Sequence, residues 1–254
     1  MPAEDRGAAV TPTAVAAAGP VFEAKKVRYA YGDLVAVWEA SLSARAGQAV
    51  AVVGRNGAGK TTLMFGLAGV LGTAGGSVHL EGTEVTKWSP WKRALNGISL
   101  VPEGKRVFRE LTVQENIALG LPRSVRGKER RERLDEIFER FTILADKRDQ
   151  LAGACSGGQQ QLLSIASALT MRPRVLLVDE PSSGLAPVAV EDVMAKLTEL
   201  KAEGMAIVLV EQRIEEVVTG IADHVVVLEQ GRIVLEDAPG RIDLADLEQR
   251  LSVA

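Results

Sequence analysis

The sequence predicts an α/β protein in which helices cover both faces of a parallel sheet and a mostly helical subdomain is inserted at about residues 95–165. Two observations carry this prediction. After Pro173 continuous apolar strands alternate with helical segments. From about residue 111 two-residue alternation gives way to helical periods rich in charge. A chain of 254 residues is long enough for a single domain over 21–254 that includes such an insertion.

Five strands are predicted in the first part of the chain from two-residue alternation and short β-branched runs. They lie at 21–29, 35–44, 48–53, 76–81 and 97–101. Short Gly-containing turns between the opening strands favour an antiparallel arrangement. Residues 1–20 are rich in small residues and prolines, bury too little apolar surface to offset ordering entropy, and are expected to form a disordered tail.

The second part of the chain predicts the insertion and then the parallel sheet. Residues 126–141 are rich in Arg and Glu and carry one apolar stripe, formed by Leu134, Ile137, Phe138 and Phe141. The later strands are expected at Val175–Val178, Ala206–Val210, Val225–Leu228 and Ile233–Leu235. Helices are expected at 188–203 and 213–221.

Composition excludes several classes of protein. The net charge of −3 is not the basic excess expected of a nucleic-acid-binding domain. No apolar run approaches the roughly 20 residues that span a bilayer. Glu4, Asp5 and Pro12 are incompatible with a secretory signal peptide. The single cysteine, Cys155, excludes an intrachain disulfide and suits a reducing compartment.

The most specific motif is a glycine-rich loop between the apolar strand 49–53 and a helical run that starts near Thr62. It reads Gly54, Arg55, Asn56, Gly57, Ala58, Gly59, Lys60, Thr61 and fits G-x-x-x-x-G-K-[ST]. Successive backbone N–H groups and the helix N-terminus can surround phosphate oxygens. Lys60 would contact the β- and γ-phosphates of ATP, and Thr61 would bind Mg²⁺. The strand and helix on either side favour this over an ordinary turn with an exposed lysine.

A second motif is an apolar strand that ends in two carboxylates, Asp179 and Glu180. Asp179 can hold Mg²⁺, and Glu180 can orient or deprotonate the attacking water. An acidic pair at a strand end is by itself usually a solvated turn or a helix cap. The phosphate loop in the same chain favours the functional interpretation.

A third motif opens a helix shortly before the acidic strand. It reads Ser156, Gly157, Gly158, Gln159 and Gln160. Ser-Gly-Gly at a helix N-terminus is a second candidate anion site, although alone it would be read as an ordinary capped helix. Its place between the phosphate loop and the acidic pair is the order found in ABC ATPases, which the chain resembles over about residues 21–240.

The resemblance implies a P-loop core of the RecA-like type, an antiparallel β subdomain and a helical subdomain that carries the signature at Ser156–Gln159. Two such domains pair head to tail, and each signature closes over nucleotide bound by the other. Tyr31 matches the aromatic that stacks on adenine, the alternative being a half-buried strand aromatic. Residues 183–186 match the loop that contacts the partner domain.

Three positions depart from the usual family pattern. Cys155 replaces a leucine and is interpreted as a small packing residue. Glu103 replaces the glutamine that touches Mg²⁺ and senses the membrane partner. Gln212 replaces the switch histidine. The two histidines, His79 and His224, lie in or beside predicted strands and are interpreted as structural.

These departures could indicate an impaired ATPase, but a narrower resemblance argues otherwise. The segments 101–116, 184–187 and 209–212 are similar to the ATPases of branched-chain amino-acid importers, which share the Glu and Gln substitutions. This group implies integral-membrane permease subunits, a second ABC ATPase chain, an external solute-binding protein and no nucleic-acid partner. The chain would then be cytoplasmic and bound to the inner face of the membrane.

The coupling surface is expected near Glu103–Arg109, where Lys105, Arg106 and Arg109 form a basic cluster. A solvated surface is the alternative for this cluster, and it is preferred for the charge run at 123–133. Rival functions are an iron–sulfur assembly ATPase and a lipopolysaccharide-export ATPase, both expected to keep the switch histidine. A DNA-repair ATPase would need a long coiled-coil insertion, and a translation factor would need a second cassette.

Overall fold

An antiparallel sheet of four strands forms one side of the protein, in a computed structural model that describes residues 19–104, 106–212, 217–218 and 220–252. Its strand order is β2-β1-β4-β5. The strands are β1 (Phe22–Tyr31), β2 (Leu34–Ala44), β4 (Thr73–Leu80) and β5 (Thr83–Glu84). The predicted strands at 21–29, 35–44 and 76–81 are therefore confirmed with small changes of boundary, and β5 is an addition.

A second sheet of six strands forms the centre, in the order β10-β9-β3-β8-β7-β6. Its members are β3 (Ala49–Val53), β6 (Ile98–Val101), β7 (Val175–Asp179), β8 (Ala206–Glu211), β9 (His224–Glu229) and β10 (Arg232–Asp237). All neighbours are parallel except β10, which runs antiparallel to β9. The antiparallel arrangement expected of the opening strands is confirmed for β1 and β2. Strands β3 and β6 belong to the parallel sheet, and their almost continuously buried side chains suit a sheet covered on both faces.

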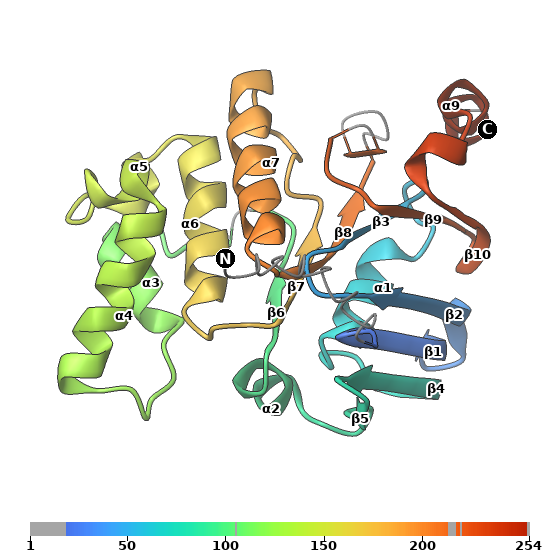
Figure 1. The fold of residues 1–254 in the computed structure, drawn as a ribbon, viewed down its shortest axis with the longest axis horizontal. Helices are drawn as coiled ribbons and strands as arrows, with labels where there is room; N and C mark the ends of the chain where they lie inside the picture. The colour runs from blue at the N-terminus through green and yellow to red at the C-terminus, as the bar shows by residue number, and fades with distance from the viewer. Residues whose placement is uncertain (1–18, 105, 213–216, 219, 253–254) are drawn as a thin grey trace, which may run out of the picture.

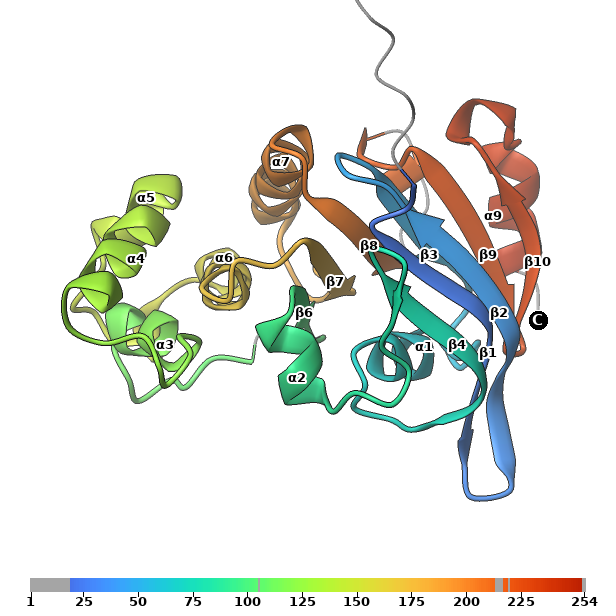
Figure 2. The same ribbon diagram turned by 60° about the horizontal axis from the view of Figure 1, so that its bottom comes forward.

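Helices surround these sheets as Figures 1 and 2 show. Helix α1 (Lys60–Leu67) packs beneath the strands of both sheets, and α2 (Pro90–Leu95) precedes β6. On the other side α7 (Pro187–Ala202) lies between the large sheet and the helical lobe (Figure 1). The chain then reaches a short 3₁₀ turn (Pro239–Arg241) and α9 (Leu244–Ser252) beside β9 and β10 (Figure 2).

The helical lobe comprises α3 (Val113–Leu119), α4 (Gly127–Arg140), α5 (Thr142–Ala145), a 3₁₀ turn (Ala152–Ala154) and α6 (Gly157–Leu169). The predicted start near residue 95 falls too early, because β6 pairs with β7 in the central sheet. The apolar stripe of α4 packs as predicted: Leu134, Ile137, Phe138 and the following Phe141 are all at most 9% exposed. These side chains belong to the same hydrophobic cluster as buried residues of α6 and α7, and this shared core holds the lobe to the rest of the protein.

Strand β3 lies at the centre of the large sheet and separates two hydrophobic cores. Ala49, Ala51 and Val53 face the core shared with α7 and the helical lobe. Val50 and Val52 face the core that contains α1 and the antiparallel sheet. All five residues are buried, so the strand that leads into the glycine-rich loop is packed from both sides.

Some predictions lie partly outside the described residues. Residues 217, 218 and 220 are helical, and 213–216 and 219 of the predicted helix at 213–221 are outside the described part. Residues 1–18 of the expected tail also lie outside it. Within the described residues no helix has the length and apolar character needed to cross a bilayer.

Candidate functional site

The glycine-rich loop connects β3 to α1 and passes close to two other backbone segments. Gly57 and Gly59 have φ of 79° and 101°, the left-handed region that favours glycine. A Cβ atom at Gly54 would lie 2.2 Å from the Leu228 carbonyl oxygen, and one at Gly59 would lie 2.6 Å from that of Ala36. The motif glycines are therefore needed for both backbone conformation and space.

Lys60 begins α1 and turns back across the loop. Its side chain is 4% exposed, and Nζ donates hydrogen bonds to the carbonyl oxygens of Gly54 (2.8 Å) and Arg55 (3.1 Å). Nζ also lies 3.5 Å from Glu180 Oε1. These partners compensate the desolvation of a buried ammonium and fix its position beside the acidic strand end.

A cavity of about 450 Å³ opens over the loop and the first turn of α1. Its lining residues are Leu34, Val35, Ala36, Gly57, Gly59, Lys60, Thr61, Thr62 and Gln230. One side is apolar and comes from β2, while the other offers loop N–H groups and a cation. An anionic ligand with a less polar portion fits this combination.

Tyr31 is not among the residues that line this cavity, although it ends β1 one short turn before Leu34. Its side chain is 52% exposed at the end of β1, which fits the alternative of a half-buried strand aromatic and also leaves the ring accessible from solvent. Arg55 and Asn56 are exposed on the loop, and Ala58 is buried with its carbonyl oxygen accepting from Gly231 N.

Asp179 ends β7 as a fully buried carboxylate. It is 0% exposed, and neither carboxylate oxygen has a hydrogen-bond partner within the described residues. Burial raises the pKa of Asp179 to about 6; repulsion from Glu180 and Glu103 adds to this, while the Thr61 hydroxyl and Lys60 oppose it. An unpartnered buried carboxylate beside a threonine hydroxyl is a suitable ligand pair for Mg²⁺.

Glu180 follows in a left-handed backbone conformation, with φ of 44°. Its backbone N–H donates to the Val210 carbonyl oxygen at 3.0 Å. The amide Nε2 of Gln212 donates a short hydrogen bond to Glu180 Oε2. The structure thus brings together Glu180, Lys60 and Gln212, three residues that the sequence placed far apart in the chain.

Glu103 lies at the rim of the same region. It is exposed in the segment after β6, and its Oε1 accepts a hydrogen bond from Ser183 Oγ at 3.4 Å. Its charge contributes to the raised pKa of Asp179, so the two carboxylates lie in the same region.

The signature segment is well formed but separate from the Lys60 cavity. Ser156 caps α6: its hydroxyl accepts from Gln159 N at 3.3 Å, while Gln159 Oε1 accepts from Ser156 N at 3.0 Å. Gly158 packs against Ala189 of α7, where a Cβ atom would lie 2.7 Å from the alanine methyl. No residue of 156–159 is among those that line the cavity.

Cys155 is buried beside this cap, as expected of a packing residue, and burial raises the pKa of its thiol. His79 lies on β4, and His224 at the start of β9 pairs with Glu236 of the edge strand β10 at 2.9 Å. Their structural interpretation agrees with these positions.

Sequence reasoning missed five residues at the site. The cavity is also lined by Leu34, Val35, Ala36 and Gln230. Glu211 lies buried between Ser182 and Gln212. The four cavity residues come from hairpins that no motif marks. Glu211 left one clue, an acidic residue at the end of an otherwise apolar strand.

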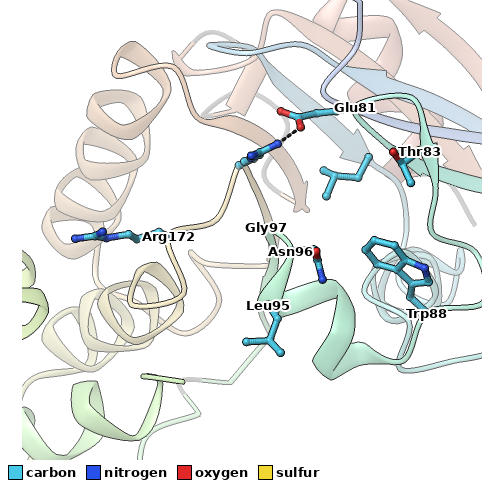
Figure 3. Close-up of a pocket in the computed structure, with 9 residues that line it drawn as sticks. Glu81, Thr83, Trp88, Leu95, Asn96, Gly97 and Arg172 are labelled. Carbon is cyan, nitrogen blue, oxygen red and sulfur yellow. Dashed lines mark ion pairs between the residues drawn. The ribbon is translucent and has the colours of Figure 1, made fainter. Parts of the chain in front are cut away.

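A second cavity, of about 340 Å³, lies near the N-terminal ends of β6 and β7, whereas Asp179 and Glu180 lie at the C-terminal end of β7 (Figure 3). Its lining residues are Leu80, Glu81, Thr83, Trp88, Leu95, Asn96, Gly97, Arg172 and Arg174. Arg174 forms an ion pair with Glu81 across it. None of the motif residues borders this cavity, so the candidate site is assigned to the Lys60 cavity.

Comparison with known proteins decides the family. The profile of the family described as ABC transporter matches residues 37–183, from β2 through the acidic pair. The chain belongs to the ABC transporter family. As a member it is an ATP-binding ATPase subunit, which confirms the predicted fold class and enzyme type.

Individual relatives agree with this membership. The chain is 39% identical over 212 residues to the high-affinity branched-chain amino acid transport ATP-binding protein BraG of Pseudomonas aeruginosa, covering 84% of this chain and 90% of BraG. It is 29% identical to the lipopolysaccharide export system ATP-binding protein LptB of Haemophilus influenzae. That alignment covers 87% of this chain and 92% of LptB.

Among solved structures, the ATP-binding cassette MJ1267 of an ABC transporter superposes with a TM-score of 0.83 at 27% identity. The alignment covers 93% of this chain and all of MJ1267. A structure of the same cassette in its ADP conformation gives a TM-score of 0.81 at 26% identity.

Proposed function

We propose that this ATPase energises an importer for branched-chain amino acids or a related small solute. The observation that carries the proposal is the 39% identity to BraG over nearly the whole of both chains. Glu103 and Gln212, which the importer group also has, both contact functional segments here: Glu103 accepts from Ser183, and Gln212 donates to Glu180.

In this proposal the loop N–H groups from Gly54 to Thr62 and the Lys60 ammonium bind the ATP phosphates. Tyr31 stacks on the adenine from the edge of the cavity, next to Leu34 and Val35. Thr61 and Asp179 hold Mg²⁺, with Glu103 nearby, and the ion supplies charge neutralisation for the phosphate oxygens. Asp179 has free oxygens for this task within the described part of the chain.

Glu180 acts on the attacking water. Its carboxylate lies at the end of the central sheet, 7% exposed, with one oxygen near Lys60 and the other bonded to Gln212. Gln212 remains neutral at all relevant pH values, so it orients the carboxylate by hydrogen bonding without adding a charge. Glu180 then orients or deprotonates water for attack on the γ-phosphate.

A complete site requires a second ABC ATPase chain. The signature segment Ser156–Gln159 begins at an exposed serine on the helical lobe and lies outside the Lys60 cavity. They would cover the γ-phosphate bound by a partner, while the partner's signature covers the ATP bound here. A related but distinct ATPase is the expected partner, with a second copy of this chain as the alternative.

The permease would dock near α2 and the segment after β6. Large apolar side chains are exposed there: Trp91 is 54%, Leu95 46% and Phe108 61% exposed. Arg106 and Arg109 lie in the same segment and are exposed, while Lys105 is outside the described residues. Docking at this surface would place the chain on the cytoplasmic face of the membrane, with an external solute-binding protein on the other side.

Co-purification followed by transport tests the proposal. The tagged chain should isolate integral-membrane subunits and a second ATPase, and the reconstituted complex should accumulate radiolabelled leucine or valine only with ATP. Isolation with a lipid-exporting membrane complex would favour the function of the LptB relative. Isolation with soluble scaffold proteins of iron–sulfur assembly would contradict transport altogether.

A further inference from the structure

Glu211 is a buried acid that the proposed mechanism does not use. It ends β8 next to Gln212 and is 1% exposed. Desolvation raises the pKa of its carboxyl group, while hydrogen bonds from Ser182 and Gln212 act in the opposite direction. A buried carboxylate is costly unless its oxygens are hydrogen-bonded, and the structure shows what bonds to this one.

Both oxygens of Glu211 hold the loop that follows the acidic pair. Oε1 accepts from the backbone N–H of Ser182 at 2.8 Å, and Oε2 accepts from the Ser182 hydroxyl at 2.8 Å. Oε2 also accepts from the backbone N–H of Gln212 at 3.2 Å. Ser182 is itself 3% exposed, so this two-pronged contact is shielded from water.

These contacts close a ring around Glu180. The ring runs from Glu180 through Pro181 to Ser182, crosses to Glu211, continues to Gln212 and returns to the Glu180 carboxylate. Within it Glu180 has φ of 44°, a conformation that a non-glycine residue keeps only when its surroundings impose it. The ring supplies that constraint from both sides of Glu180.

We propose that Glu211 is a positioning residue for ATP hydrolysis. It holds Ser182 and the Gln212 backbone so that the Gln212 amide meets the Glu180 carboxylate in one orientation. The inference rests on the assignment of Glu180 to the attacking water. It also predicts that movement of the loop at Ser183 and Gly184, which the partner domain would contact, reaches Glu180 through Ser182 and Glu211.

The test compares variants in the complete transporter complex. In Glu211→Gln the amide Nε2 takes the place of Oε2, which accepts hydrogen bonds from the Ser182 hydroxyl and the Gln212 N–H. An amide nitrogen cannot accept a hydrogen bond, so the contact with the Gln212 N–H is lost. We expect kcat to fall about tenfold while the Kd for ATP changes less than about twofold, because the phosphate loop is untouched. Ser182→Ala removes one hydrogen bond and should lower kcat about threefold. Glu199→Gln, on the exposed face of α7, is the matched surface control.

A double-mutant cycle distinguishes positioning from general destabilisation. If Glu211 acts through Gln212, Glu211→Gln should cost much less in a Gln212→Ala background than alone. Thermal unfolding of each variant shows whether the protein is folded. If Glu211→Gln does not fold, Ser182→Ala takes its place in the comparison. Wild-type kcat in folded Glu211→Gln, or losses that simply multiply in the double variant, would overturn the inference. An inactive wild-type complex would instead contradict the assigned ATPase role.

Discussion

The two halves of the candidate site are built in different ways. At the end of β3 the phosphate loop is a contiguous segment in which backbone groups and one lysine do the binding. At the ends of β7 and β8 the site consists of side chains from 179–183 and 211–212, held by bonds between segments about 30 residues apart. Substitutions in neighbouring segments should leave the geometry of the phosphate loop unchanged. In the second half, substitution of any one hydrogen-bonded residue should disturb the positions of the others.

Replacing Lys60 tests the contiguous half and should have the largest effect. Lys60→Ala removes the cation nearest the phosphates, so hydrolysis should fall at least about a hundredfold and ATP binding should weaken strongly. Steady-state turnover and fluorescent-nucleotide binding measure these losses, with circular dichroism to confirm folding. Near-normal turnover in a folded variant would contradict the assignment of the loop.

Replacing Glu180 should separate binding from chemistry. Glu180→Gln keeps its shape but loses the carboxylate, so hydrolysis should slow by on the order of a hundredfold while ATP binding persists. The ATP-bound pair should then accumulate, visible by sedimentation with the partner ATPase. Association should be weaker with ADP and lost in a Ser156→Arg background. Equal association with either nucleotide would argue against the shared site.

Gln212→Ala tests the hydrogen-bonded half of the site and should lower kcat less than Glu180→Gln does. It removes the hydrogen bond to Glu180 Oε2, and kcat should fall about tenfold with little change in ATP affinity. Because a glutamine replaces the usual histidine, no histidine titration from this position should appear in the pH dependence of the wild-type rate. Glu103→Gln, by contrast, should mainly alter the Mg²⁺ concentration that gives half-maximal rate.

Asp179→Asn should have a small and favourable effect on the stability of the fold. In the absence of nucleotide the wild-type carboxylate is buried without hydrogen bonds among the described residues, so replacing it with a neutral amide should stabilise the fold by about 1–2 kcal/mol. Chemical denaturation without Mg²⁺ measures this, while Mg²⁺-dependent hydrolysis should be lost. A destabilised variant would show that Lys60 already compensates the charge.

The same contrast explains what could be predicted from the sequence. Gly54 to Thr61 form one contiguous segment whose residue types follow from its backbone geometry. Both the phosphate loop and its place between a strand and a helix could therefore be predicted from the sequence. The contact of Gln212 with Glu180 could be anticipated only as a family correspondence, and Glu211 not at all, because its role depends on which strand ends meet in space. The misplaced start of the insertion has a similar origin: β6 is short, and only its pairing with β7 assigns it to the central sheet.

The packing of β3 has a mechanical consequence. Its five residues are wedged between two cores, with β8 on one side and β9 on the other, so its peptide groups can separate from their neighbours only when most of the domain opens. The loop that begins one residue later is therefore anchored to a strand that resists local opening. We expect nucleotide binding at this loop to move the less tightly packed surrounding segments more than it moves β3.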